Sequence, residues 1–166
     1  MCAILVHSDS KSQVESAEDN GEMGYFNPIH LATRFGCIKT VGKILYNSKN
    51  SNIPNNNGIT PLHLAVIYNY LELAKLLLKF TDSVIVQDNL GMTPIFNAVD
   101  NGNLDMLKVL MTATDNPNIP DIHGGTLIHV AAKEGNLDIL ELLLTKTNVN
   151  DLKAQDNEGK NPSALC

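Results

Sequence analysis

Residues 57–79 of the chain read NGITPLHLAVIYNYLELAKLLLK, and this stretch decides the fold. Its Asn-Gly opening is typical of a turn. Thr60 then stands where a helix N-cap is needed, because its hydroxyl can accept a hydrogen bond from first-turn N–H groups. Pro61 follows at the first helical position, where the missing N–H has no intrahelical partner to lose. Apolar residues at helical spacing continue to residue 79, so we predict two short helices separated by a turn at Asn69.

The same pattern recurs every 33 residues along the chain. A further start, at Pro162, comes 35 residues after Leu127. Two short helices cannot bury their apolar faces alone, so we expect successive copies to stack. The interval links three series, which are Pro28, Pro61, Pro94 and Leu127; His30, His63, Phe96 and His129; and Ala32, Ala65, Ala98 and Ala131.

Each copy should end its first helix at a residue that tolerates left-handed backbone, and should begin a second helix shortly afterwards. The second helices are expected to expose a polar stripe and to bury their leucines. The expected helix ends are Gly36, Asn69, Gly102 and Gly135, and the later second helices span 71–79, 104–111 and 137–144.

The segment GITPLHLA (58–65), together with the 33-residue period, resembles the ankyrin repeat, and the resemblance covers about residues 22–166. It implies an all-α solenoid of stacked helix-turn-helix units with projecting β-turns. Residues 1–21 form an acidic arm that we expect to be disordered. Four repeats and a partial fifth are expected at about 24–54, 55–87, 88–120, 121–155 and 156–166.

Three departures from the repeat pattern stand out. Asn27 replaces the capping threonine of the first unit, Phe96 replaces the histidine of the third, and Leu127 replaces the proline of the fourth. The fifth unit stops at Cys166 in mid-helix. We expect either that a partner closes this end or that the chain is a piece of a longer protein.

Composition limits the class of protein. The formal net charge of −6 and a pI of about 5.2 argue against nucleic acid or an anionic membrane as the main partner. The three cysteines are too few and too scattered for a disulfide framework or a zinc site, and they fit a reducing compartment. The start MCAILVHSDS has no basic residue before its apolar run, unlike a signal peptide. We expect a cytoplasmic or nuclear location and no cofactor.

The histidines invite a catalytic interpretation, but their positions favour a structural one. Each lies at the third helical position beside a cap, where an imidazole can bond to the cap or to a neighbouring backbone group. Successive repeats hold them on the order of 10 Å apart, too far to share one zinc ion. No Ser, Cys or acidic partner stands at a recognisable spacing, so no enzyme is expected. The expected structural set is Asn27, Pro28, His30, Thr60, Pro61, His63, Thr93, Pro94, Thr126 and His129.

The resemblance also implies a binding surface, made by the turn tips and the exposed end of each first helix. The large apolar members of this set are expected to form one stripe, since such patches usually mark interfaces. The alternative is that Phe26, Ile59 and Met92 pack against neighbouring turns. The implied contact residues are Phe26, Arg34, Phe35, Asn56, Asn57, Ile59, Ile67, Tyr68, Asn89, Leu90, Met92, Asp100, Asn101, Ile122, His123, Gly125, Lys133, Glu134, Asn157, Glu158 and Lys160.

For function, the resemblance implies a non-catalytic module that binds a protein and inhibits or tethers it. The segments GITPLHLAVI and TLIHVAAKEG, with the spacer NVNDLKAQDNEG, are similar to the IκB group, which holds Rel-type (NF-κB) transcription factors inactive. An acidic chain would suit their basic DNA-binding surface. The alternatives are a cyclin-dependent-kinase inhibitor, although that group shortens the first helix of its second repeat, and the targeting domain of a larger enzyme or channel. We expect a monomer unless the uncapped C-terminal end pairs.

Overall fold

The computed structural model describes residues 27–48, 51–81, 83–146 and 149–162. Within these ranges the chain forms short α-helices joined by turns. Pairs of helices repeat along the chain, with a first helix of seven residues in each of the four pairs. The helices are α1 (Pro28–Arg34), α2 (Ile38–Ser48), α3 (Pro61–Ile67), α4 (Leu71–Leu78), α5 (Pro94–Asp100), α6 (Leu104–Met111), α7 (Leu127–Lys133), α8 (Leu137–Leu144) and α9 (Val149–Leu152).

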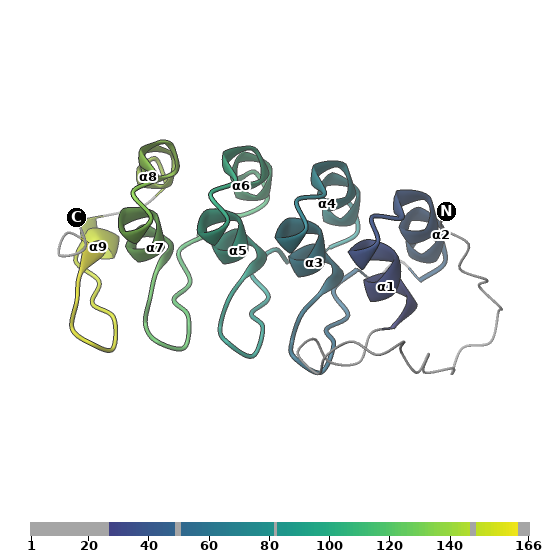
Figure 1. Ribbon diagram of the computed structural model, residues 1–166, viewed down its shortest axis with the longest axis horizontal. Coiled ribbons are helices and arrows are strands. Elements are labelled where there is room, and N and C mark those ends of the chain that lie inside the picture. Colours follow the sequence, from purple (N-terminus) through teal and green to yellow (C-terminus); the bar gives the residue numbers. More distant parts are fainter. Residues whose placement is uncertain (1–26, 49–50, 82, 147–148, 163–166) are drawn as a thin grey trace.

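The helix pairs stack side by side in two rows (Figure 1). The helices α1, α3, α5 and α7 form an inner row in which each contacts the next. The helices α2, α4, α6 and α8 form an outer row, and long turns project on the side away from it. This arrangement confirms the predicted all-α solenoid of stacked helix-turn-helix units.

Local sequence explains where the inner helices begin and end. The Oδ1 atom of Asn27 accepts from the Ile29 N–H at 3.1 Å, and Thr93 Oγ1 accepts from the Phe96 N–H at 3.2 Å. The inner helices stop where the backbone turns left-handed. Asn69, with a φ of 56°, takes the place that glycine holds in the other copies, because asparagine tolerates this conformation better than most residues.

The core lies between and along the two rows. Small alanines at Ala32, Ala65, Ala98 and Ala131 are at most 1% exposed, so neighbouring inner helices can approach closely. Leucines such as Leu77 and Leu110 are fully buried on the outer helices. Burial of each such side chain stabilises the fold by about 1.5–3 kcal/mol.

The projecting turns form a ladder of their own. In each turn an Asn or Asp side chain accepts two backbone N–H groups, as Asp88 does from Leu90 at 2.8 Å and Met92 at 2.9 Å. Adjacent turns are joined by backbone bonds, for example from the Ile122 N–H to the Leu90 carbonyl at 3.2 Å. Gly91 has a φ of 75°, and a Cβ there would lie 2.7 Å from the Ile122 nitrogen, so the ladder needs glycine at this position.

Several expectations fall outside the described residues, namely the acidic arm 1–21, Phe26 and the limits of the repeat domain at 22 and 166.

One of the three cysteines departs from the expectation of free thiols in a reducing compartment. Cys37 is buried and disulfide-bonded, although the cysteine count suggested a reducing compartment. No helix in the described ranges is long and apolar enough to cross a membrane.

Candidate partner-binding surface

His63 joins two repeats through both of its ring nitrogens. Its Nδ1 atom accepts from the Thr60 backbone N–H at 3.1 Å, and it lies 2.8 Å from Thr60 Oγ1. Its Nε2–H donates to the Met92 carbonyl at 3.1 Å, in the next projecting turn. A ring that accepts at Nδ1 and donates at Nε2 is the neutral imidazole. Burial lowers the pKa of His63, and this outweighs the opposing effects of the Met92 carbonyl and Asp88.

His30 and His129 also bond the following turn through Nε2. The Nδ1 atom of His129 accepts from the Thr126 backbone N–H at 3.2 Å, as in His63, whereas that of His30 lies 2.8 Å from Asn27 Oδ1, which is itself an acceptor. Their Nε2 atoms lie 3.0 Å from the Ile59 and Lys160 carbonyls, again in the following turn. Burial also lowers the pKa of His30. No group of three or more His, Cys, Asp or Glu residues in the described part of the chain could hold a metal ion. The histidines therefore link the first, second and fourth helix pairs to the following turn.

Phe96 breaks this series at the third repeat. Its ring is 3% exposed and occupies the same buried position. A phenyl ring has no N–H to donate to Gly125, whose carbonyl is equivalent to that of Met92. The contact between the third and fourth repeats therefore lacks the histidine bond found at the other described contacts.

The ends of the inner helices carry two predicted contact positions per repeat, and these form a row that changes character along the stack. The first two repeats supply aromatic and aliphatic side chains together with one arginine, whereas the last two supply only polar and charged ones. Phe35 is 63% exposed, which is unusual for a phenylalanine. Lys133 and Glu134 form an exposed ion pair at 3.7 Å. The row consists of Arg34 and Phe35, Ile67 and Tyr68, Asp100 and Asn101, and Lys133 and Glu134.

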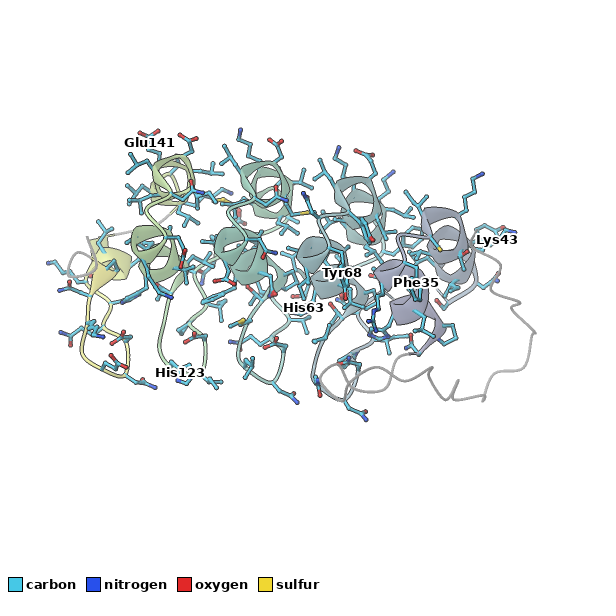
Figure 2. All side chains as sticks on the ribbon, viewed as in Figure 1. Phe35, Lys43, His63, Tyr68, His123 and Glu141 are labelled. Carbon is cyan, nitrogen blue, oxygen red and sulfur yellow. The ribbon has the colours of Figure 1, made fainter. Side chains whose placement is uncertain are left out.

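At the apolar end of this row, Tyr70 contacts both the first and the second repeat. Its ring stacks on that of Tyr68, with centroids 6.0 Å apart. Its hydroxyl donates to the Arg34 carbonyl at 3.4 Å, and its ring lies over Gly36, where a Cβ would be only 3.2 Å away. Figure 2 shows Phe35 and Tyr68, which lie at the C-terminal ends of the neighbouring helices α1 and α3. We call Phe35, Ile67, Tyr68 and Tyr70 the aromatic cluster.

The sequence prediction missed Tyr70, although a signal was present. The residues 33 and 66 positions later are Asn103 and Asn136, whose side chains cap α6 and α8. Tyr70 makes no such cap bond for α4. A tyrosine that replaces a capping asparagine is a departure from the repeat, and here the half-buried ring packs against the core as well as on Tyr68.

The projecting turns carry the other predicted contacts. Leu90 and Ile122 are each 53% exposed, and His123 lies at the end of its turn (Figure 2). Ile59 and Met92 are half-buried, and Met92 packs against the core. The structure thus divides the predicted stripe into the aromatic cluster at the helix ends and an apolar pair at the turn tips. The other tip residues, Asn56, Asn57, Asn89, Gly125, Asn157, Glu158 and Lys160, are polar or lack a side chain.

Stacked helix hairpins with projecting, hydrogen-bonded turns define a class of repeat scaffold whose exposed rim is free for contacts. A family model described as ankyrin repeats (3 copies) matches residues 2–88, 29–121 and 81–156. The chain therefore belongs to the ankyrin repeat family, whose members are typically non-catalytic protein-interaction modules. A search of the curated proteins gives no match.

Proposed function

We propose that the chain is a non-catalytic module that binds a protein partner and inhibits or tethers it. The observation that carries this proposal is the aromatic cluster, in which Phe35 is 63% exposed and the Tyr68 and Tyr70 rings stack. Exposed aromatic side chains are the usual anchors of protein interfaces, because they bury a large area while few rotatable bonds become fixed.

Two members of the cluster, Tyr68 and Tyr70, are held in place by contacts within the chain. Tyr70 is held by its bond to the Arg34 carbonyl and by its place over Gly36, and Tyr68 is held by the stacked ring. A side chain that is already fixed loses little conformational entropy on binding. The two tyrosines should therefore lose less conformational entropy on binding than mobile surface side chains would.

The finer proposal is an IκB-like action on a Rel-type transcription factor. The net charge of −6 supports it, since an acidic scaffold attracts a basic DNA-binding surface. The cyclin-dependent-kinase inhibitor alternative has less support. The first helix of the second repeat, α3, has seven residues like α1, α5 and α7, whereas that group shortens it.

The test is capture of partners from the cells that make the protein, with the wild-type chain and a Phe35→Ala/Tyr68→Ala variant. A matched control is Asn101→Ala/Glu134→Ala, which changes the equivalent positions of the third and fourth repeats. The proposal predicts that the aromatic variant keeps its helical circular dichroism and loses the main partner, while the control keeps it. An unchanged set of partners with the aromatic variant would contradict the proposed surface.

The IκB-like proposal has its own assay. A purified Rel-type dimer on labelled DNA should be displaced by the wild-type chain and not by the aromatic variant. If a captured partner is bound while Rel-type dimers stay on DNA, the interaction module stands and the IκB-like action is wrong. Coding sequence that continues past Cys166 into an enzyme or channel domain would favour the targeting alternative instead.

A further inference from the structure

The turns that join the inner and outer helix of each repeat lie in order along one edge of the stack. The Tyr70 hydroxyl donates to the Arg34 carbonyl at 3.4 Å, which joins the first of these turns to the second. The Asn103 side-chain amide donates to the Asn69 side-chain oxygen, which joins the second turn to the third. The aromatic cluster therefore lies on a surface that continues over three repeats. We call this surface the turn edge, and it consists of residues 34–39, 67–72 and 100–105.

The turn edge is open in the middle of the stack as well as in the first repeat. The inner helices α3 and α5 each contact an inner helix on both sides. Nevertheless Ile67, in the second turn, is exposed, and so are Asp100 and Asp105 in the third. Neighbouring repeats thus cover the sides of a helix pair that face along the stack and leave this edge uncovered. Its exposure follows from the geometry of the repeat and does not depend on where the stack begins or ends.

Charge changes sign along the turn edge. The first turn holds Arg34 and Lys39, and the equivalent positions of the third turn hold Asp100 and Asp105. In the second turn Glu72 is neutralised by an ion pair with a lysine of its own helix at 2.6 Å. The ion pairs in the described part of the chain leave out Lys39, Asp100 and Asp105. The aromatic cluster thus spans a basic turn and a neutral turn, and an acidic turn follows.

Two of these charges are unfavourable for the helices that carry them. Lys39 stands in the first turn of α2, where α4, α6 and α8 carry an acidic residue. Asp100 is the last residue of α5, whereas α1 and α7 end with Arg34 and Lys133. The helix dipole favours acidic residues at the N-terminus and basic residues at the C-terminus. Helix stability therefore does not account for either charge.

The basic turn also belongs to a basic part of an acidic chain. The whole chain has a formal net charge of −6, yet residues 27–81 contain six lysines and arginines and one acidic residue, Glu72. A partner segment that reaches the aromatic cluster therefore meets a positive potential, although the protein as a whole is negative. Over the third turn the same segment meets a negative potential.

We propose, resting on the proposed function, that the partner lays an extended segment of mixed charge along the turn edge. Its acidic residues lie beside Lys39, its apolar residues lie on the aromatic cluster, and its basic residues lie beside Asp100. Repeats are on the order of 10 Å apart, so the first and third turns are about 20 Å apart. An extended chain rises about 3.3 Å per residue, so the acidic and basic residues of the segment should be about six positions apart.

Other occupants fit this pattern less well. The chain's own residues 1–26 hold five acidic residues against Lys11, so they suit Lys39 and offer little to Asp100. A second copy related by a two-fold axis would set Lys39 against Asp100, but it would also set the exposed Phe35 against the polar Asn101. A segment of mixed charge with an apolar centre satisfies both charges and the aromatic cluster.

The test uses three synthetic, fluorescently labelled peptides of about 12 residues, long enough to cross the three turns. The mixed peptide has two glutamates and two lysines about six positions apart, on either side of a leucine and a phenylalanine. The two control peptides have glutamate only or lysine only at the charged positions. Fluorescence anisotropy with the purified full chain at low salt should show that the mixed peptide binds about two- to fivefold more tightly than either control peptide, the scale of an exposed charge pair.

Charge reversal should then change the preferred peptide. Lys39→Glu makes both ends of the edge acidic, so the lysine peptide should become the tightest binder. Asp100→Lys makes both ends basic, so the glutamate peptide should. Each variant should bind the mixed peptide about two- to fivefold more weakly than the wild type does. Both changes suit the helix dipole, so urea unfolding should show equal or greater stability, and weaker binding cannot then be ascribed to unfolding.

The matched controls make the same charge changes at exposed positions away from the edge, namely Lys153→Glu and Asp115→Lys. Both should keep the preference for the mixed peptide. The proposal would be overturned if the wild type showed no such preference, if Lys39→Glu or Asp100→Lys kept it, or if the control variants lost it. Self-association in sedimentation that Lys39→Glu removes would also overturn it, because the edge would then serve a second copy.

The capture assay tests the proposed function separately. If the Phe35→Ala/Tyr68→Ala variant loses the main partner while the wild-type chain shows no preference among the peptides, the proposed function stands and the mixed-charge segment is wrong. If that variant keeps its partners, the proposed surface itself is wrong, whatever the peptides show.

Discussion

The first two repeats and the last two are built on one backbone plan, yet they offer different surfaces to a partner. At the ends of the inner helices, the first pair presents Phe35 and Tyr68, whereas the second pair presents Asn101 and Glu134. Within the stack, the third repeat has the buried Phe96 where the other three have a histidine bonded to the following turn, as His63 is to the Met92 carbonyl. The comparison teaches that caps, glycines and alanines hold the solenoid, while departures from the repeat set its local stability and its surface.

The largest expected effect concerns the histidine link itself. His63→Phe imposes the third-repeat arrangement on the second repeat, and it leaves the buried Thr60 N–H without its Nδ1 acceptor. We expect a loss of about 2–3 kcal/mol in the free energy of unfolding, because a buried donor loses its partner. Urea unfolding followed by circular dichroism measures it. The matched control is His123→Phe, at an exposed turn tip, which should change stability by less than about 0.5 kcal/mol. Equal effects of the two variants would contradict the role given to His63.

Acid should weaken the histidine-linked contacts. Burial lowers the pKa of His63 and His30 below the unfolded value of 6.5, so the unfolded chain binds more protons over this range. Stability should therefore be complete above pH 6.5 and fall as the pH drops below it, by at most about 1.4 kcal/mol per pH unit for each histidine. Urea unfolding between pH 7.5 and 5 measures the slope, and His63→Phe should reduce it. A slope that is unchanged in that variant would assign the effect to other groups.

The reverse exchange should strengthen the third repeat. Phe96→His supplies an Nε2–H for the Gly125 carbonyl and an Nδ1 for the Thr93 cap, by analogy with His63 and Thr60. The expected gain is about 1 kcal/mol, the usual net contribution of a hydrogen bond. Amide hydrogen exchange in α7 and α8 should slow in parallel, since the fourth repeat would then open less readily. Faster exchange there would show that the phenylalanine packs better than the histidine can bond.

The smallest expected effect lies at the start of α2. Lys39 stands in its first turn, where α4, α6 and α8 carry Glu72, Asp105 and Asp138. A positive charge at a helix N-terminus opposes the helix dipole, so Lys39→Glu should raise stability by about 0.3–1 kcal/mol at low salt. Thermal unfolding at low and at 1 M salt measures this gain, which should shrink as the salt screens it. A gain that persists at 1 M salt would point to a packing effect.

The fold could be predicted from sequence because its signals are local. Thr60, Pro61 and Asn69 fix the ends of α3 through groups within a few residues, and the 33-residue period then specifies the stack. The aromatic cluster could not be predicted as such, since Tyr70 meets Gly36 only after two repeats have packed. The division of the apolar stripe has the same cause, because the half-burial of Met92 depends on its packing against the core. The exposure of a side chain depends on residues from neighbouring repeats, and the local sequence does not specify these.

The central claim is that a partner is held by the helix ends of the first two repeats. Amide hydrogen exchange of the full chain, with and without the captured partner, tests it most directly. The account predicts that binding slows exchange at residues 34–37 and 67–71, while residues 100–103 and 133–136 change little. Slowed exchange confined to the last two repeats, with residues 34–37 and 67–71 unchanged, would contradict it.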